Sequence, residues 1–257
     1  MNKKLFNIKN FVTIVTGSSR SIGLKIAAGF YEYGAKVIRI DLNLKKHKLY
    51  KFDDYIIDLT KQKLVDRCVN EIKHKYGRID VLINNAGVTT NSTNFYDEKI
   101  LKKTLSVNLI AAYNLSNKVC KIMSKRKKGS IINIASDMGI ISPDHRIYEP
   151  NKKINYKGVN FNTPISYSVA KSGIISMTKY LATYWAKKGI RVNCVSPTGV
   201  KKQKQDKQFV KQLSERIPLG RMAKSDELNG AIIYLCSNAS SYVTGHNLVV
   251  DGGRTIW

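Results

Sequence analysis

Short apolar runs alternate along the chain with longer segments whose apolar residues recur at helical spacing. The runs are rich in Val and Ile, which favour strands, and small or polar turn residues follow them. The segments between them fit amphipathic helices, several of which stop at a glycine. The predicted strands are residues 11–15, 35–41, 55–60, 81–87, 130–136, 190–196 and 247–253, and a single long helix is predicted over residues 98–123.

This alternation continues to the end of the chain without a linker. We therefore predict an α/β fold in which residues 1–257 form one doubly wound, Rossmann-type domain around a mostly parallel seven-stranded sheet. Residues 137–166 form a long connection that we expect on the substrate side. Residues 200–224 begin with a Lys- and Gln-rich stretch that has little apolar surface to bury, and we expect them to be a mobile substrate lid.

Composition changes this picture little. Of the 257 residues, 43% are hydrophobic, which is enough for one large core. The formal net charge of +26 comes from 44 Lys and Arg against 18 Asp and Glu. Most of these cations are lysines spread over the whole chain, whereas nucleic-acid readers concentrate Arg on one face. We interpret the charge as solvated lysines with a weak preference for anionic ligands, and predict no nucleic-acid partner.

The four cysteines lie at positions 68, 120, 194 and 236, without the spacing of a metal or redox site. They are typical of reduced, buried thiols, so we predict a cytoplasmic protein that binds no metal. The charged N-terminus is not followed by an apolar run of signal-peptide length. No segment approaches the roughly 18 uninterrupted apolar residues of a membrane span, and we predict no membrane partner.

Residues 16–23 (TGSSRSIG) connect the first predicted strand to a helical pattern. A strand, a glycine-bearing turn and a helix N-terminus together suit a pyrophosphate, because free N–H groups and the helix dipole attract it. Gly17 permits a sharp turn, and Gly23 permits close packing of the helix on the strand. This context predicts a dinucleotide cofactor.

Asp41 ends the second predicted strand, about twenty residues beyond the glycine loop. A carboxylate there accepts hydrogen bonds from ribose hydroxyls and repels a 2′-phosphate, which favours NAD over NADP. Arg20 and Arg39 are nearby cations that soften this preference, so NADP stays open. The alternative interpretation of Asp41 is an ordinary turn residue at a strand end.

Tyr167 and Lys171, in the stretch YSVAK, are the candidate chemical groups. Residues four apart share one face of a helix, so the Lys171 ammonium would lie near the Tyr167 hydroxyl. A fixed positive charge stabilises the phenolate and lowers the tyrosine pKa toward working pH. Tyr167 would then exchange a proton with an alcohol or carbonyl oxygen. This spacing alone is weak evidence, because chance places Tyr and Lys four apart on many helices.

Several motifs together resemble the short-chain dehydrogenase/reductase family, in family order and over almost the whole chain. They are residues 16–23, Asp58, residues 84–87 (NNAG), Asn108, Ser136, Tyr167 with Lys171, residues 197–199 (PTG) and residues 251–253 (DGG). The resemblance implies an NAD(H)-dependent oxidoreductase that interconverts a secondary alcohol and a ketone, with the cofactor supplying the hydride.

The resemblance also implies roles for individual residues. Tyr167 would be the general acid and base, Lys171 would lower its pKa, and Ser136 would bind the substrate oxygen. Asn108 would hold a water that links Lys171 to solvent. The implied cofactor contacts are Gly17, Ser19, Arg20, Ile22, Asp41, Asp58, Leu59, Asn85, Ala86, Gly87, Tyr167, Lys171 and Val200.

Two positions depart from the family pattern, while the catalytic positions are intact. Ser21 stands where a glycine is usual, and its Cβ strains any backbone with positive φ. We expect Ser21 either to weaken cofactor binding or to bond a phosphate oxygen. Thr198 stands where a glycine commonly follows Pro197.

The interval from Ser136 to Tyr167 is longer than is usual in the family and should border the substrate pocket. It contains Asp144, His145, Arg146, Tyr148, Asn151, Lys152 and Lys153. Polar and cationic groups suit a hydroxyl- or phosphate-bearing ligand better than an acyl chain. The stretch is also similar, more loosely, to reductases of bacterial surface-sugar and nonulosonic-acid pathways. We expect a sugar, sugar phosphate or nucleotide sugar as substrate; an insertion that only covers an interface stays open.

Other functions also stay open. A 3-oxoacyl-carrier-protein reductase would normally use NADPH, which Asp41 disfavours. A non-catalytic dinucleotide-binding protein would not need the intact catalytic residues, and a basic nucleic-acid-associated protein would show strongly salt-dependent binding without dehydrogenase activity.

The family usually forms tetramers or dimers, so the resemblance implies a homo-oligomer. Residues 178–186 are apolar enough for such an interface, and core packing explains them as well.

Overall fold

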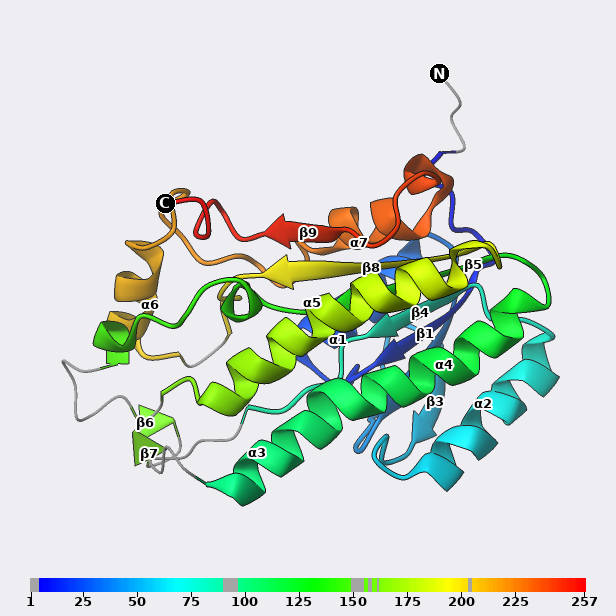
Figure 1. Cartoon of the computed structure of the whole chain (residues 1–257), viewed down its shortest axis with the longest axis horizontal. Helices are drawn as coiled ribbons and strands as arrows, with labels where there is room; N and C mark the ends of the chain where they lie inside the picture. Colours follow the sequence, from blue (N-terminus) through cyan, green and yellow to red (C-terminus); the bar gives the residue numbers. More distant parts are fainter. Residues whose placement is uncertain (1–4, 90–96, 149–154, 157–158, 161, 203–204) are drawn as a thin grey trace.

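The computed structural model describes residues 5–89, 97–148, 155–156, 159–160, 162–202 and 205–257 (Figure 1). A seven-stranded sheet in the order β3-β2-β1-β4-β5-β8-β9 forms its centre, and each neighbouring pair is parallel. The strands are β1 Val12–Thr16, β2 Lys36–Asp41, β3 Asp53–Ile56, β4 Val81–Asn84, β5 Gly129–Ile134, β8 Ile190–Pro197 and β9 Asn247–Val250. The predicted doubly wound α/β fold is confirmed.

Helices cover both faces of this sheet (Figure 1). They are α1 Ser21–Glu32, α2 Gln62–Tyr76, α3 Glu98–Leu105, α4 Ala111–Ser124, α5 Ile165–Ala186, α6 Lys207–Ser214 and α7 Asn229–Cys236. One apolar cluster joins the sheet to α2, α4 and α5, and a second joins its other face to α1 and α7. No helix within the described ranges has both the length and the apolar character needed to span a membrane.

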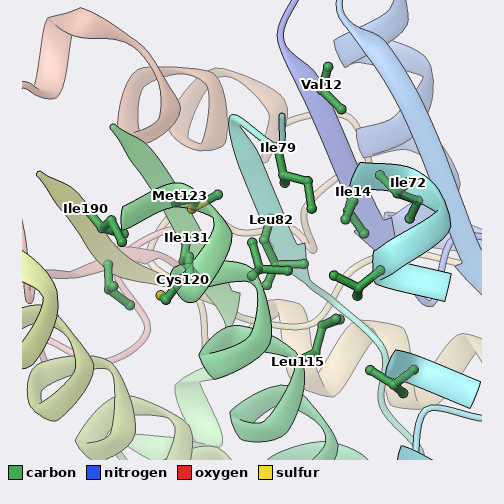
Figure 2. Packing of buried hydrophobic residues seen from close by; sticks show 14 of the residues in the cluster. Val12, Ile14, Ile72, Ile79, Leu82, Leu115, Cys120, Met123, Ile131 and Ile190 are labelled. Atoms are coloured by element: carbon green, nitrogen blue, oxygen red, sulfur yellow. The ribbon is translucent and has the colours of Figure 1, made fainter. Parts of the chain in front are cut away.

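The central strands are buried along their whole length, which is why they appear in the sequence as continuous apolar runs rather than alternating ones. Figure 2 shows Leu82 of β4 and Ile131 of β5 among the core residues, close to Cys120 and Met123 of α4. Burying one such Leu or Ile side chain contributes about 1.5–3 kcal/mol. The sheet is therefore a rigid base for the loops at its carboxyl edge.

Three local predictions differ from the structure. The helix predicted over residues 98–123 is α3 and α4 joined by a π-helical segment, η1 Ser106–Ile110. Strand β3 ends at Ile56, because Asp58 instead accepts hydrogen bonds from the N–H and the hydroxyl of Thr60 in a local turn, at 2.9 and 2.7 Å. The stretch after Val200 contains α6, whose Leu213 is buried, so this stretch buries more than its composition indicates.

The connection between β5 and α5 contains two short 3₁₀ segments, η2 Asp137–Gly139 and η3 His145–Tyr148, and a small antiparallel pair, β6 Asn155–Tyr156 and β7 Val159–Asn160. Segment η3 packs on α6 through Ile147, Leu213 and Phe209. Figure 1 shows α6, the β6–β7 pair and the C-terminus on the side to which the arrowheads of β8 and β9 point. The predicted substrate-side loop and lid therefore lie together at the carboxyl edge of the sheet.

Candidate active site

The carboxyl ends of β1, β4, β5 and β8 bring the predicted site residues to one edge of the sheet. The order of the strands reverses between β1 and β4, and ligands bind at such a switch point in open α/β sheets. Gly17 follows β1, Asn85 follows β4, Ser136 follows β5 and Thr198 follows β8. Residues far apart in the sequence therefore share one site.

The glycine loop needs its two glycines for geometric reasons. Gly17 has φ +64°, and a Cβ at this residue would lie 2.6 Å from the Cα of Ala86. A Cβ on Gly23 would lie 2.1 Å from the carbonyl oxygen of Gly17. The Asn85 side chain donates hydrogen bonds to the carbonyls of Thr16 and Gly17, at 3.0 and 2.9 Å. Asn85 therefore fastens the loop to β4, and its contact with the cofactor stays a prediction.

The N-terminus of α1 suits a dinucleotide pyrophosphate. None of the described side chains caps this helix, and its first turn carries no acidic residue. Its first N–H groups and positive dipole end therefore remain available to an anion. Asp41 lies next to the loop, because one carboxylate oxygen accepts from the Ser19 N–H at 2.9 Å and the other from the Leu42 N–H at 2.7 Å. The residues present fit a bound NAD(P), which would supply or accept the hydride.

Ser21, which departs from the family glycine, adopts φ +48°. A residue with a Cβ is strained in this left-handed region, so the strain foreseen from the sequence is present. Ser21 is also the first residue of α1, where the pyrophosphate is expected. Any strain here acts directly on the cofactor loop.

Arg39 does not have the role that the sequence indicated. Its side chain is 2% exposed, forms a bidentate ion pair with Asp54, and stacks on the ring of Phe52 with 4.6 Å between the guanidinium carbon and the ring centroid. A guanidinium engaged in this way is not available to a 2′-phosphate, because such contact would break a buried pair. Arg20, in contrast, is exposed beside α1.

Ser136 and Tyr167 lie within hydrogen-bonding reach of each other. Burial raises the pKa of Tyr167 to about 12, and the nearby Ser136 hydroxyl, which favours the ionised form, offsets only part of this effect. The nearby Asp137 charge raises the pKa further. The expectation of a lowered tyrosine pKa is therefore wrong for this structure. At neutral pH Tyr167 is a proton donor.

Lys171 lies one helical turn after Tyr167, with its Nζ 5.6 Å from the centre of the tyrosine ring. The ammonium donates a 2.6 Å hydrogen bond to the carbonyl oxygen of Ile134, at the end of β5. Burial lowers the pKa of Lys171 to about 8. The structure therefore places the ammonium beside the tyrosine ring, with its hydrogen bond to the sheet rather than to the phenol, and its role toward Tyr167 stays a prediction.

Asn108 lies in the π-helical segment between α3 and α4. Its side-chain oxygen accepts from the Val88 N–H at 2.7 Å, and its amide donates to the Val88 carbonyl at 2.9 Å. Asparagine in a helix interior is unfavourable unless the side chain has a partner, and here the partner is the backbone of Val88, in the segment after β4. Its role in holding a water stays a prediction.

The remaining predicted cofactor residues lie around the same edge. Val200 is buried and pairs with Ala223 in an isolated parallel bridge, which fixes the chain after Gly199. Leu59 packs partly against the larger apolar cluster. Asp58 is engaged with Thr60, and its hydrogen bonds hold the pKa of its carboxyl below the usual value. Contacts of these residues with the cofactor stay predictions.

Sequence reasoning missed two residues of the site, Asp137 and Arg254. Asp137 accepts hydrogen bonds from Ser136 and Thr198, and forms a buried ion pair with Arg254 from the C-terminal segment. Thr198 therefore has a structural reason to replace glycine, since its hydroxyl donates to Asp137 at 2.7 Å. The available signal was an acidic residue directly after Ser136 in an otherwise apolar stretch.

On the substrate side, Asp144 binds two arginines. Arg146 donates at 2.8 Å and Arg216 at 2.6 Å, and these hydrogen bonds hold the pKa of Asp144 well below its usual range. The Tyr148 ring stacks on Phe209 of α6 with 5.9 Å between centroids. Asn151, Lys152 and Lys153, which contributed to the substrate prediction, lie outside the described residues. The pairing of Asp144 and Arg216 joins the loop to the segment after α6.

The fold and the site define an α/β oxidoreductase that binds a nicotinamide dinucleotide. Residues 11–148 match the family model described as short chain dehydrogenase, and residues 154–255 match the model described as enoyl-(acyl carrier protein) reductase. The chain belongs to the short-chain dehydrogenase/reductase family, and it is an NAD(P)-dependent enzyme of that family.

Two relatives of known name match almost the whole chain. An NAD-dependent glycerol dehydrogenase of Listeria innocua is 32% identical over 98% of this chain and 97% of its own length. A 3-oxoacyl-acyl-carrier-protein reductase of Thermotoga maritima is 33% identical over 95% of this chain and 98% of its own length. The similarity therefore supports an enzyme that interconverts alcohol and ketone, without selecting the substrate.

Two solved structures are close in shape. A short chain dehydrogenase from Leptospira borgpetersenii with bound NAD+ has a TM-score of 0.89 and 32% identity, with 99% of this chain and 97% of that chain covered. A gluconate 5-dehydrogenase from Burkholderia cenocepacia, in complex with NADP and tartrate, has a TM-score of 0.86 and 29% identity, with 99% and 98% covered. Similar structures therefore bind either dinucleotide.

Proposed function

We propose that this enzyme uses NAD(H) to interconvert a secondary alcohol and a ketone on a polyhydroxylated substrate, such as a sugar, sugar phosphate or nucleotide sugar. The observation that carries the reaction is the placement of Ser136 within hydrogen-bonding reach of Tyr167, with Lys171 one turn further along α5. These groups lie at the carboxyl edge of the sheet, beside the glycine loop.

The residues divide the work as follows. Ser136 holds the reacting oxygen. Tyr167, which is protonated at neutral pH, donates its proton to the oxygen of a ketone and takes it back from an alcohol. The positive charge of Lys171 makes that proton easier to lose and orients the nicotinamide ribose. Placing these groups before reaction removes much of the entropic cost of bringing them together.

Support for a polar substrate comes from the segments that border Ser136 and Tyr167. Tyr148 and Thr163 share a hydrogen bond of 2.8 Å, and Asp144 is paired with Arg146 and Arg216 in the same region. The glycerol dehydrogenase and the gluconate 5-dehydrogenase also act on polyhydroxylated compounds, as their names state. A role in carbohydrate biosynthesis would follow from such a substrate.

Support for NAD comes from Asp41. Its carboxylate lies beside the loop and bonds the Ser19 N–H, so a 2′-phosphate there would meet a negative charge. The pairing of Arg39 with Asp54 removes one of the two cations that would offset this repulsion. Arg20 is the remaining cation next to the loop.

A 3-oxoacyl-carrier-protein reductase is the second candidate, because the Thermotoga maritima relative has this activity by name. The two candidates differ in substrate polarity and in cofactor. Turnover of acetoacetyl thioesters with NADPH, without turnover of polyols, would favour this second function.

We also propose that the enzyme is a cytoplasmic homo-oligomer. All four cysteines are buried free thiols, which suits a reducing compartment. Leu181 and Trp185 of α5 are core residues, whereas Tyr180 and Tyr184 are 66% and 64% exposed and stack on each other. Exposed aromatic side chains of this kind suit a subunit interface of a dimer or tetramer. Light scattering during gel filtration would measure the assembly.

The deciding experiment is a substrate panel followed by NADH absorbance, with NADP(H) run in parallel. The panel should include glycerol, gluconate, sugar phosphates, nucleotide sugars and acetoacetyl thioesters. We expect turnover with a polyhydroxylated compound and NAD(H). An enzyme that turns over none of these compounds with either cofactor would refute the proposed function.

A further inference from the structure

Arg254 is a buried cation beside Ser136 that has no part in the proposed reaction. Its side chain is 8% exposed, and its Nη1 donates hydrogen bonds to Asp137 at 2.6 Å and to the Thr198 hydroxyl at 3.4 Å. The other carboxylate oxygen of Asp137 lies 2.8 Å from the hydroxyl oxygen of Ser136. A single carboxylate therefore separates the guanidinium from the residue that is proposed to hold the reacting oxygen.

Much of the hydrogen-bonding capacity of Arg254 is unused within the part of the chain that the structure describes. A guanidinium has five N–H donors in a planar fork. Among the described residues, Nε and Nη2 have no acceptor, yet neither nitrogen is fully buried. Arg39, in contrast, uses both its Nε and its Nη2 to bind the two oxygens of Asp54. Arg254 therefore keeps one edge of its fork for another acceptor.

The groups around Arg254 belong to segments that border the substrate. Asp137 and Thr198 follow β5 and β8, and ligands bind beyond the carboxyl ends of strands in this kind of sheet. Tyr148 of η3 is also close to the guanidinium. Burial raises the pKa of Tyr148, and the charge of Arg254 offsets part of this rise. An acceptor that reaches Arg254 would thus come from the substrate side.

The turn that carries Arg254 is fixed before any ligand binds. Asp251 accepts hydrogen bonds from the N–H groups of Gly253 and Thr255, at 2.8 and 2.7 Å, and Gly253 has φ +91°. A Cβ on Gly253 would lie 2.8 Å from the Pro218 ring, so the turn packs directly on the segment after α6. A cation held in this way loses little conformational freedom when it binds an anion.

The charges in this region also favour an anion. Arg254 and Asp137 neutralise each other, whereas Asp144 is shared by two arginines, Arg146 and Arg216. One positive charge therefore remains after these pairs have formed. Carboxylates and phosphates are the groups that accept two parallel N–H bonds from one edge of an arginine fork.

We propose that Nε and Nη2 of Arg254 bind a carboxylate or phosphate group of the substrate, so that the enzyme prefers an anionic polyhydroxylated compound to a neutral one. Asp137 holds the guanidinium through Nη1 and leaves the other edge to the ligand. This inference narrows the proposed function and rests on it, because it takes the region around Ser136 as the place where the substrate binds.

Two matched pairs of compounds test the preference. Gluconate and glucitol differ in a carboxylate against a hydroxymethyl group, and glycerol 3-phosphate and glycerol differ in a phosphate. The measured quantity is the ratio of kcat/KM with NAD+ for the anionic over the neutral compound. We expect a ratio of about ten or more in one pair, which identifies the anion as carboxylate or phosphate. Turnover with ratios near one in both pairs would overturn this inference and leave the proposed function intact.

Arg254→Lys tests the unused edge of the fork. Lysine keeps the positive charge and can still pair with Asp137, but it lacks the planar pair of donors. We expect the ratio of anionic over neutral kcat/KM to fall by about tenfold, the factor for one charge-assisted hydrogen bond. A wild-type ratio in this variant would overturn the role of Nε and Nη2.

Asp137→Asn combined with Arg254→Met removes the guanidinium without leaving a buried charge unpaired, and Asp137→Asn alone is the matched control. The control keeps the guanidinium and loses a negative charge, so its ratio should equal or exceed that of wild type. The double variant should lose the preference. A purely structural role would lower kcat/KM for both members of a pair by the same factor. An unchanged ratio in the double variant, or an equal fall in the control, would overturn the proposal.

Binding to the NADH-loaded enzyme supplies a measurement that does not depend on turnover. Calorimetry with the same four compounds gives their Kd values for wild type and for each variant. We expect the anionic member of one pair to bind more tightly than the neutral one in wild type, and this difference to be lost without Arg254. Such binding without any turnover would refute the proposed function and support the role of Arg254. Equal Kd values within both pairs would overturn that role, so the two failures are distinguishable.

Discussion

The Lys171 ammonium donates a 2.6 Å hydrogen bond to the carbonyl oxygen of Ile134 while it lies one helical turn from Tyr167. Burial destabilises its charged form and lowers the pKa of Lys171 to about 8. The charge of this lysine therefore changes within the pH range in which dehydrogenases are assayed. Two predictions follow from this buried ammonium, one for activity and one for stability.

For activity, we expect kcat/KM for ketone reduction to fall as pH rises through about 8, because Lys171 loses its proton there. A neutral lysine no longer helps Tyr167 to release its proton. The measurement is a pH–rate profile with NADH at saturating concentration. Lys171→Arg is the control, since a guanidinium keeps its charge over this range. A descending limb of unchanged position in Lys171→Arg would assign the effect to another group.

For stability, the direction of the pH dependence follows from the number of protons that the folded and unfolded chains bind. Folded Lys171 binds its proton less tightly than the ordinary value of 10.5, so the unfolded chain holds more protons between about pH 8 and 10.5. The contribution of Lys171 to the free energy of unfolding therefore rises with pH across this window, and its destabilising effect is complete below about pH 8. We expect Lys171→Met to exceed wild type by up to about 3 kcal/mol at pH 7. The excess should shrink toward pH 10.5 in urea unfolding, and a constant excess would contradict this explanation.

The fold was predictable from the sequence because fully buried parallel strands produce continuous apolar runs, as in β4 and β5. The boundaries of helices and strands that depend on polar side chains were not predictable in this way. The turn at Asp58 and the π-helical segment around Asn108 each form because one side chain bonds a particular backbone group. Hydrophobic periodicity carries no information about such bonds.

For the site, the location of the main residues was predictable from the sequence, whereas the pKa of Tyr167 and the pairing of Asp137 were not. The motifs predicted that Ser136, Tyr167 and Lys171 share one site, and the structure has them at one edge because the order of the strands determines where their loops meet. Their roles stay predictions. The pKa of Tyr167 was not predictable, since burial raises it and the Lys171 ammonium bonds the Ile134 carbonyl rather than the phenol. Asp137 and Arg254 are 117 residues apart, and only the folded chain shows that they pair.

Tyr167→Phe tests the proton donor directly. The ring is retained and only the transferable proton is lost, so we expect turnover to fall by about two orders of magnitude or more. The affinity for NAD should change little, because the phenylalanine preserves the packing of α5. Single-turnover kinetics and NADH fluorescence titration measure the two quantities. A variant with wild-type turnover would exclude Tyr167 as the acid and base.

Asp41→Ala tests the preference between the two dinucleotides. Loss of the carboxylate removes the repulsion of a 2′-phosphate and the acceptor for ribose hydroxyls, so the ratio of kcat/KM for NAD over NADP should fall by about tenfold or more. The Ser19 N–H also loses its partner. Asp41→Asn is the control, because its amide oxygen can still bond Ser19 without the charge. An unchanged ratio in both variants would reject the ribose role of Asp41.

Ser21→Gly tests whether serine at this position, in place of the family glycine, lowers stability or weakens cofactor binding. Ser21 adopts φ +48°, a conformation in which a Cβ costs on the order of 1 kcal/mol and a glycine is unstrained. We expect the variant to be more stable by up to that amount in thermal unfolding. If strain in the loop also weakens cofactor binding, NAD should bind more tightly to the variant.

Ser21→Ala separates this strain from a contribution of the hydroxyl. Alanine keeps the Cβ and therefore the strain, but it lacks the oxygen that could bond a phosphate at the N-terminus of α1. Weaker NAD binding in Ser21→Ala at unchanged stability would show that the hydroxyl binds the cofactor. Equal NAD affinity in wild type and Ser21→Ala, with tighter binding in Ser21→Gly, would show that the serine only strains the loop. Isothermal titration with NAD distinguishes these outcomes, because each variant changes one of the two properties of the side chain.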